Sequence, residues 1–391
     1  MGDDVVISDA KREERDGWIE ISAEVDGERV WFQAPLDVGL TLRAEPFLAA
    51  SLLEAMIREV PIRFEDDIPL SPYLHQNMPE LQAVYHCWNP ELKPVSIHAR
   101  LEEPDAVHGI VASCYSGGVD SAFTFVRRRE DIDALILVLG FDVDGPECDW
   151  DQRIERHQAF AQSMGKRLIP VKTNAREFCV ARQICWDFGH GLFLASLASM
   201  LGCRTLFVPS THTYEQLFPW GSHPLSDPMW STKVNRVVHC GAGSSRAEKV
   251  RAISHSQAVM DNIQVCRRSN SNNCGECPKC VRTMVALYLL GAHSKLLPDL
   301  NDMKLLSWLK PWDENGMTFL EDAMILARQQ GDDEVYRQLR KYHKRYQIRQ
   351  LPSMLDRMIL GGFLQRLYRK IRKPEWLDQR VMLLSKDHWD C

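Results

Sequence analysis

Residues 116–121 (SGGVDS) stand where the apolar segment 110–114 ends and a helical pattern running to about residue 129 begins. Two consecutive glycines leave the backbone amides uncovered and permit conformations that are closed to other residues. Successive N–H groups at the start of a helix form a concave anion site, and the helix dipole adds partial positive charge there. The hexapeptide therefore predicts a strand, a phosphate-binding turn and a helix in succession, which is a building unit of α/β folds.

The side chains of this loop add specific chemistry. Ser116 and Ser121 can donate hydrogen bonds to phosphate oxygens. Asp120 would repel a bare phosphate, so a bridging Mg²⁺ is the natural reason for a carboxylate here. The Gly-Lys-Ser/Thr ending of a Walker A loop is absent. The predicted phosphate-binding residues are Ser116, Gly117, Gly118, Val119, Asp120 and Ser121, of which Ser116, Asp120 and Ser121 are the candidate catalytic residues. The alternative is a strand-to-helix turn that is merely capped by Ser and Asp.

Strand and helix patterns alternate after the loop. The expected elements are a strand at 134–139, a helix at 150–164, a strand at 168–171, a helix at 191–201 and a strand at 205–208. This alternation predicts a Rossmann-like, doubly wound parallel sheet with helices on both faces. Ligands in such sheets bind beyond the carboxyl ends of the strands. The expected catalytic domain spans residues 106–292.

The flanks have a different character. Asp26-Gly27 between two alternating apolar segments is a strong hairpin signal. An amphipathic helix at 46–60, turn-rich sequence at 61–79 and a strand at 95–99 follow it, so residues 1–105 are expected to form a small α+β domain. Residues 293–391 have the pattern of a helical C-terminal region.

Charge and composition limit the function classes. The chain has 47 basic and 53 acidic residues, a net charge of −6, which argues against a protein that coats nucleic acid. Residues 1–100 carry a net charge of −10, and the rest of the chain carries +4. The many Lys and Arg residues of 341–373 are explained either by a solvated helix face or by a binding patch. Neither a secretory signal nor an apolar membrane span is visible, so a cytoplasmic location with reduced cysteines is expected.

Four of the 12 cysteines have metal-ligand spacing. They form C-x7-C-x2-C-x2-C and comprise Cys266, Cys274, Cys277 and Cys280. Four thiolates suit a structural Zn²⁺, with Cys266 closing the tetrahedron from a preceding strand. Gly275 permits a tight knuckle, and Pro278 can begin the following helix. An iron–sulfur cluster and disulfides are the alternatives.

Three further groups are candidate site residues. Asp142 and Asp144 follow the second expected strand of the catalytic domain. The Pro-rich segment 221–233 offers an aromatic ring with polar neighbours, which suits a flat heterocyclic substrate, although a packed surface loop explains it as well. Its candidate residues are His223, Asp227, Trp230 and Lys233. Arg246 and Lys249 open a helix, where cations oppose the helix dipole; an anionic partner and a solvated face are the two explanations.

The SGGVDS loop resembles the SGGxDS loop of the PP-loop ATP pyrophosphatases. The resemblance implies a Rossmann-like (HUP-type) sheet, ATP and Mg²⁺ as cofactors, transfer of AMP to a substrate oxygen and release of pyrophosphate. It also implies part of a nucleotide pocket at Asp142 and Asp144, and loop solvation explains these two residues equally well. The loop together with VCRRSNSNNCGECPKCVRT also resembles the 7-cyano-7-deazaguanine synthase (QueC) family over about residues 110–289. In that family the four cysteines hold zinc, and ATP and ammonia convert a deazapurine carboxylate to an amide and then a nitrile. This chain adds about a hundred residues on each side.

The expected function is therefore that of an ATP-dependent ligase. It would adenylate a carboxylate or amide, with a nucleobase-like 7-deazapurine or a protein as acceptor. A protein acceptor would bind through either flank, since QueC-like proteins with such additions also occur in bacterial anti-phage systems. The alternatives are a tRNA-modifying sulfurtransferase and a non-enzymatic nucleotide sensor. Asp120→Ala or Ser116→Ala is expected to abolish turnover with little loss of folding.

Overall fold

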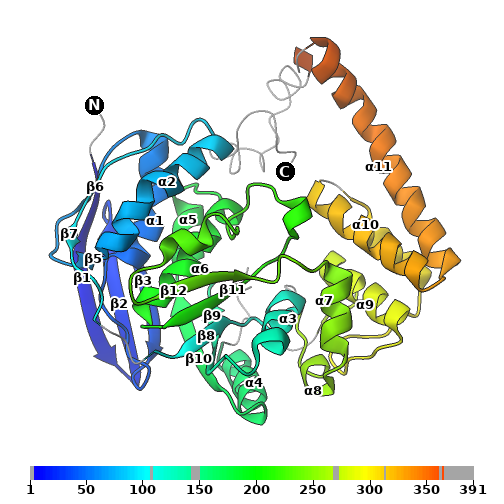
Figure 1. The fold of residues 1–391 in the computed structure, drawn as a ribbon, viewed down its shortest axis with the longest axis horizontal. Helices are drawn as coiled ribbons and strands as arrows, with labels where there is room; N and C mark the ends of the chain where they lie inside the picture. Colours follow the sequence, from blue (N-terminus) through cyan, green and yellow to red (C-terminus); the bar gives the residue numbers. More distant parts are fainter. Residues whose placement is uncertain are drawn as a thin grey trace. The chain divides into compact units, whose positions relative to one another are not determined.

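The computed structural model describes residues 4–105, 109–141, 150–266, 273–311, 314–360 and 363–364 (Figure 1). Its main feature is one ten-stranded, mostly parallel sheet with the strand order β12-β11-β8-β9-β10-β3-β2-β1-β4-β6. The helices lie around this sheet and in a second, helical part of the chain. The α/β class predicted from the sequence is confirmed.

Five parallel strands from the central region of the chain form one half of the sheet. They are β8 (Val111–Cys114), β9 (Ala134–Leu139), β10 (Arg167–Thr173), β11 (Thr205–Pro209) and β12 (Arg236–Cys240). The chain order reverses at β8, which lies between β9 and β11. Such a reversal creates a switch point, and doubly wound sheets bind ligands beyond the carboxyl ends of the strands there. The loop at 116–121 follows β8 within two residues.

The connections of these strands are helical. They are α3 (Val119–Arg128), α4 (Trp150–Ser163), α5 (Ala175–Ala181) and α6 (Trp186–Met200). The chain moves from β8 to β10 through α3 and α4, and then returns to β11 through α5 and α6. Right-handed crossovers in these opposite directions place α4 and α6 on opposite faces of the sheet. Helix α6 is buried over most of its length and starts five residues before the expected position.

Two antiparallel hairpins form the N-terminal part of the sheet. They comprise β1 (Val5–Arg15), β2 (Trp18–Val25) and β3 (Glu28–Pro35). The predicted hairpin at Asp26-Gly27 is confirmed, with φ values of 48° and 79° that suit a two-residue turn. Strand β1 was not predicted, although Asp16-Gly17, with φ values of 50° and 81°, is the same signal.

Strand β3 pairs with β10 and joins the hairpins to the central sheet. The Thr173 hydroxyl donates to the carbonyl of Trp31 at 2.7 Å. The Asn174 side chain accepts from the Trp31 N–H at 2.9 Å and donates to the carbonyl of Arg29 at 2.8 Å. The three hairpin strands therefore extend the sheet of the central region.

Asn174→Ala should weaken this junction. The substitution removes both side-chain hydrogen bonds to β3, and we expect a loss of about 1–2 kcal/mol in the free energy of unfolding, measured by urea denaturation. Asn262→Ala is the matched control, because the Asn262 amide donates to the nearby carbonyl of Ala258 at an exposed position. An Asn174→Ala midpoint equal to that of the wild type would show that the junction does not depend on this side chain.

The remaining N-terminal elements pack beside the hairpins. They are α1 (Glu45–Arg58), β4 (Ile62–Phe64), β5 (Pro69–Leu70), α2 (Pro72–Trp88), β6 (Ile97–His98) and β7 (Arg100–Leu101). Helix α2 begins inside the segment 61–79, for which the sequence pattern indicates turns. The Ser71 hydroxyl caps it by accepting from the N–H of Leu74 at 3.2 Å, and Pro72 takes the first helical position. Proline is favourable there, so Pro72 marks a helix start instead of a loop.

The second part of the chain is helical. Its elements are α7 (Arg246–Ser254), α8 (Gln257–Met260), α9 (Pro278–Leu290), η3 (Met303–Leu309), α10 (Glu314–Gln329) and α11 (Asp333–Leu360), while η1 (Tyr214–Gln216) and η2 (Asp227–Trp230) lie before β12. None of the helices in the described part of the chain has the length and apolar character needed to cross a membrane.

The chain divides into two compact units. The first holds the residues up to 116 together with 124–242, and the second holds 117–123 together with the residues from 243 onward through α7–α11. This division differs from the predicted domains 1–105, 106–292 and 293–391. Strand β3 is hydrogen-bonded to β10 across the first predicted boundary, and α10 packs on α7 and α9 across the second.

Candidate functional site

The loop at 116–121 has the geometry that its two glycines suggest. Gly117 has a φ of 76°, which glycine adopts without strain. Its carbonyl accepts from the N–H of Gln264 at 2.8 Å, which fixes the turn. Helix α3 begins two residues later at Val119, and the first helical hydrogen bond runs from Ala122 to the carbonyl of Gly118 at 2.9 Å. The first N–H groups of a helix have no intrahelical acceptor, and this is why helix starts commonly bind anions.

Asp120 on the first turn of α3 contacts two cations from α7. Arg246 Nη1 donates to Asp120 Oδ2 at 2.7 Å, and Lys249 Nζ donates to Oδ1 at 3.1 Å. The side chains of Asp120, Arg246 and Lys249 are 21%, 11% and 1% exposed. The structure thus brings together three residues that were selected from the sequence for separate reasons.

The electrostatics of this cluster favour an anion. Burial alone would raise the pKa of Asp120, but the charges of Arg246 and Lys249 outweigh it and lower the pKa to about 2. The carboxylate is therefore ionised at neutral pH, and the three side chains together carry one positive charge. The Nε of Arg246 is buried and has no hydrogen-bond partner in the described part of the chain. Buried donors of this kind are normally satisfied, so a further acceptor is expected at this position.

A capping box stabilises the N-terminus of α7, the helix that carries Arg246 and Lys249. The Ser245 hydroxyl accepts from the N–H of Glu248 at 3.3 Å, and the Glu248 carboxylate accepts from the N–H of Ser245 at 2.8 Å. This pattern satisfies two of the exposed donors at the helix start. The Ser-x-x-Glu signal is visible in the sequence and identifies where Arg246 and Lys249 enter the helix.

This geometry changes one expectation from the sequence, namely that Asp120→Ala leaves folding largely intact. Because Asp120 is the carboxylate partner of a fully buried Lys249 and a nearly buried Arg246, removing it leaves two cations without that compensation. Breaking one side of a buried ion pair is strongly destabilising. Asp120 is therefore a structural residue of this unit as well as a candidate catalytic one.

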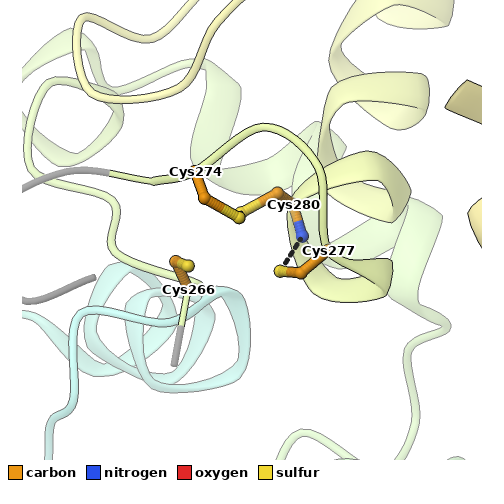
Figure 2. Close-up of side chains that lie close together, drawn as sticks. All are labelled: Cys266, Cys274, Cys277 and Cys280. Atoms are coloured by element: carbon orange, nitrogen blue, oxygen red, sulfur yellow. Dashed lines mark hydrogen bonds between the residues drawn. The ribbon is translucent and has the colours of Figure 1, made fainter. Parts of the chain in front are cut away.

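The four predicted cysteine ligands meet in one cluster (Figure 2). Their sulfur atoms all lie within 4.8 Å of one another. Cys274 lies in the turn before α9, and Cys277 is the residue that caps the start of this helix. Cys280 is on the first turn of α9, and its N–H donates to Cys277 Sγ at 3.4 Å. The sulfur atoms of Cys274 and Cys280 are 3.8 Å apart. The cluster can therefore hold a metal ion.

The arrangement fits a tetrahedral zinc site. Ligands at a Zn–S distance of about 2.3 Å in a tetrahedron are separated by roughly 3.8 Å, which equals the Cys274–Cys280 separation. The hydrogen bonds from Cys280 lower the pKa of the Cys277 thiol, whereas the same contact raises the pKa of Cys280. Four thiols so close together cannot all ionise alone, and a divalent cation removes this conflict. All four positions are protein thiolates, which is typical of a closed structural site.

Asn273 supports this centre and was missed by the sequence analysis. Its side-chain oxygen accepts from the N–H groups of Val265 and Cys266 at 2.8 and 3.0 Å, and its amide donates to the carbonyl of Ile263 at 2.9 Å. This buried amide thereby joins the Cys266 segment to the knuckle. The expected strand before Cys266 is absent from residues 261–266, and Asn273 supplies the missing constraint. Its position directly before Cys274 is the only signal in the sequence.

The segment 221–233 is a packed structure around Asp227. Asp227 Oδ2 accepts from the Ser222 hydroxyl at 2.7 Å and from His239 Nδ1 at 2.8 Å, and Oδ1 accepts from the N–H of His223 at 3.1 Å. Burial lowers the pKa of His223 to about 4. His223, Asp227 and Trp230 are buried, whereas Lys233 is exposed. The structure brings His223 and Asp227 together with His239, buries Trp230 and leaves Lys233 exposed.

Asp142 and Asp144, the other predicted nucleotide residues, lie outside the described residues. The comparisons with known proteins are negative: no family model, no curated protein and no solved structure matches the chain.

Proposed function

We propose that the chain is a PP-loop ATP pyrophosphatase with a HUP-type catalytic sheet, acting as a ligase that adenylates a carboxylate or amide and couples it to a nitrogen nucleophile. One observation carries the proposal. The SGGVDS loop follows β8, at the reversal of the strand order, and its Asp120 contacts Arg246 and Lys249. A glycine turn, a helix start and two cations of low exposure are groups that can bind the polyphosphate of a nucleotide and stabilise the leaving pyrophosphate.

The proposed reaction has two steps. A substrate carboxylate or amide oxygen attacks the α-phosphorus of ATP, the bond between the α-phosphorus and its bridging oxygen breaks, and pyrophosphate leaves. The nitrogen nucleophile then attacks the activated carbon, AMP leaves, and the nitrogen loses a proton. Loop amides, Arg246 and Lys249 would stabilise the charge that develops on the leaving pyrophosphate. Fixed donors of this kind are each worth about 3–4 kcal/mol of barrier.

Asp120 has a second role in this proposal. Both its carboxylate oxygens take part in ion pairs. The triphosphate is the anion that Arg246 and Lys249 can bind in place of Asp120, and the released carboxylate can then hold Mg²⁺. Bound Mg²⁺ would neutralise phosphate charge during the transfer. The cysteine cluster, with four protein thiolates, is assigned a structural zinc.

The chemistry of the acceptor follows from the resemblance. The similarity to 7-cyano-7-deazaguanine synthase favours a nucleobase-like 7-deazapurine carboxylate with ammonia. Both regions added to that family pattern are structured in part, and a protein acceptor could bind through either. The acidic residues 1–100 disfavour nucleic acid as a partner of that region.

Pyrophosphate release is the test. Purified protein with ATP and Mg²⁺ should release pyrophosphate when a deazapurine carboxylate and ammonia, or the correct protein acceptor, is present. Lys249→Met should lower the rate by roughly 100-fold, because it removes a buried cation from the leaving group. Lys295→Met is the control, since Lys295 is exposed and pairs with Asp261.

Three outcomes would contradict the ligase. These are equal pyrophosphate release by Lys249→Met and wild type, tight ATP binding without pyrophosphate release across all acceptors, and a brown protein with visible absorbance. The second outcome indicates a nucleotide sensor. The third indicates an iron–sulfur centre and a sulfurtransferase.

A further inference from the structure

Helix α10 is hydrogen-bonded to the first turn of α7 by the carboxylate of Asp322. Asp322 Oδ2 accepts from the backbone N–H of Ala247 at 2.6 Å. The nearby Ser245 side chain favours the ionised form of Asp322 and so lowers its pKa. Asp322 therefore binds the residue that follows Arg246 on the chain.

The position of Asp322 is favourable for α7. A helix start has unpaired N–H groups and partial positive charge, and both favour a carboxylate. Arg246 and Lys249 add two positive charges to the same turns, which the dipole disfavours. Burial raises the pKa of Asp322, and the Ser245 side chain, the hydrogen bond from Ala247 and the charge of Arg246 oppose that shift. Asp322 thus offsets the electrostatic cost of placing cations at this helix start.

Helix α10 is itself held by the helix of the metal centre. The guanidinium carbon of Arg282 on α9 lies 3.4 Å from the ring centroid of Phe319, which is three residues before Asp322 on α10. Residues three apart on a helix share a face, so Phe319 and Asp322 both face the α7–α9 side. Helix α10 packs against both α7 and α9 (Figure 1). The cation–π contact and the packing of α10 on α7 and α9 together hold Asp322 at the level of the first turn of α7.

We propose that Asp322 is a positioning residue of the phosphate site. It holds the first turn of α7 so that Arg246 and Lys249 lie against Asp120 and, in turn, against the polyphosphate. The helical C-terminal region then completes the nucleotide site in addition to any role in binding a partner. The identity of the anion rests on the proposed function. The orientation of α7 by Asp322 is independent of that function.

The experiment compares Asp322→Asn, Asp322→Glu and Glu321→Gln in the full-length chain. Glu321 is the matched control because it is adjacent on α10 and pairs with His343. Asp322→Asn should weaken binding of inorganic pyrophosphate, measured by calorimetry, by about 10- to 100-fold, since displacement of binding groups by about 1 Å has effects of this size. It should also raise the KM for ATP more than it lowers kcat. Asp322→Glu should restore part of the affinity, and Glu321→Gln should resemble the wild type.

Hydrogen exchange separates this inference from the ligase itself. The Ala247 amide should exchange faster in Asp322→Asn than in the wild type and Glu321→Gln, whether or not pyrophosphate is ever released. If the wild type binds pyrophosphate but releases none from ATP, the ligase fails and the positioning role stands. Unchanged exchange at Ala247 together with unchanged pyrophosphate affinity would overturn the positioning role. A lower melting temperature with unchanged affinity would also overturn it, because that result describes a purely structural carboxylate.

Discussion

Asp120→Ala is expected to lower the stability of the unit that contains α7 and to be rescued by pyrophosphate. Removing the carboxylate leaves Arg246 and Lys249 without their shared partner, and we expect a loss of about 3 kcal/mol in the free energy of unfolding. Pyrophosphate without Mg²⁺ should then raise the melting temperature of Asp120→Ala more than that of the wild type, because the anion replaces the missing charge. ATP-dependent pyrophosphate release should fall below detection in the variant. Scanning calorimetry with and without pyrophosphate measures the first two effects.

The pH dependence has a defined sign. The pKa of Asp120 is lowered to about 2 in the folded chain, below its unfolded value near 4. Its stabilisation is therefore fully present above about pH 4 and is lost as the pH falls through about 2. The stability difference between wild type and Asp120→Ala should narrow over this acidic range.

Ser116→Ala is the comparison for Asp120→Ala. Ser116 is exposed in the same loop, so its removal should reduce pyrophosphate release while leaving the melting temperature nearly unchanged. If Asp120→Ala melts like the wild type, the ion pairs contribute nothing to stability. If pyrophosphate raises the melting temperature of Asp120→Ala and of the wild type by the same amount, Arg246 and Lys249 do not bind the anion in place of Asp120.

Cys280→Ser should remove the metal and unfold the region around α9. The purified wild type is expected to contain one zinc ion per chain by elemental analysis, and the variant much less, because three thiolates bind zinc more weakly than four. Zinc contributes folding energy directly in closed four-thiolate sites, where apparent binding energies are about 10–16 kcal/mol. The variant should therefore lose helical circular dichroism at a lower temperature, and chelation should do the same to the wild type.

Cys240→Ser is the matched control for the metal centre. Cys240 is partly exposed on β12 and lies outside the cluster, so this variant should keep both its zinc and its melting temperature. Retention of a full equivalent of zinc by Cys280→Ser would exclude Cys280 as a ligand. Iron with visible absorbance in the wild type would replace the zinc assignment with an iron–sulfur cluster.

The sequence determined the parts of this protein that contiguous residues encode. The turn at Gly117, the helix start at Val119, the hairpin at Asp26-Gly27 and the cysteine spacing each depend on residues within a short stretch. Backbone conformation at glycine, capping and ligand spacing are local properties, so predicting them needs no knowledge of the remaining chain. The α/β class follows for the same reason, since alternating strand and helix patterns are recognised segment by segment.

Only the tertiary structure decided which distant segments meet. Asp120 is 126 and 129 residues from Arg246 and Lys249, and Asp322 is 75 residues from Ala247. The hydrogen bond between Trp31 and Asn174 joins residues 143 apart in the sequence, at the junction where β3 pairs with β10. Such contacts depend on how whole elements pack, because a sheet edge or a helix start accepts any partner that satisfies its hydrogen bonds and charge. The sequence supplied the cations and the carboxylates, and packing determined that they share one phosphate site in the proposed function.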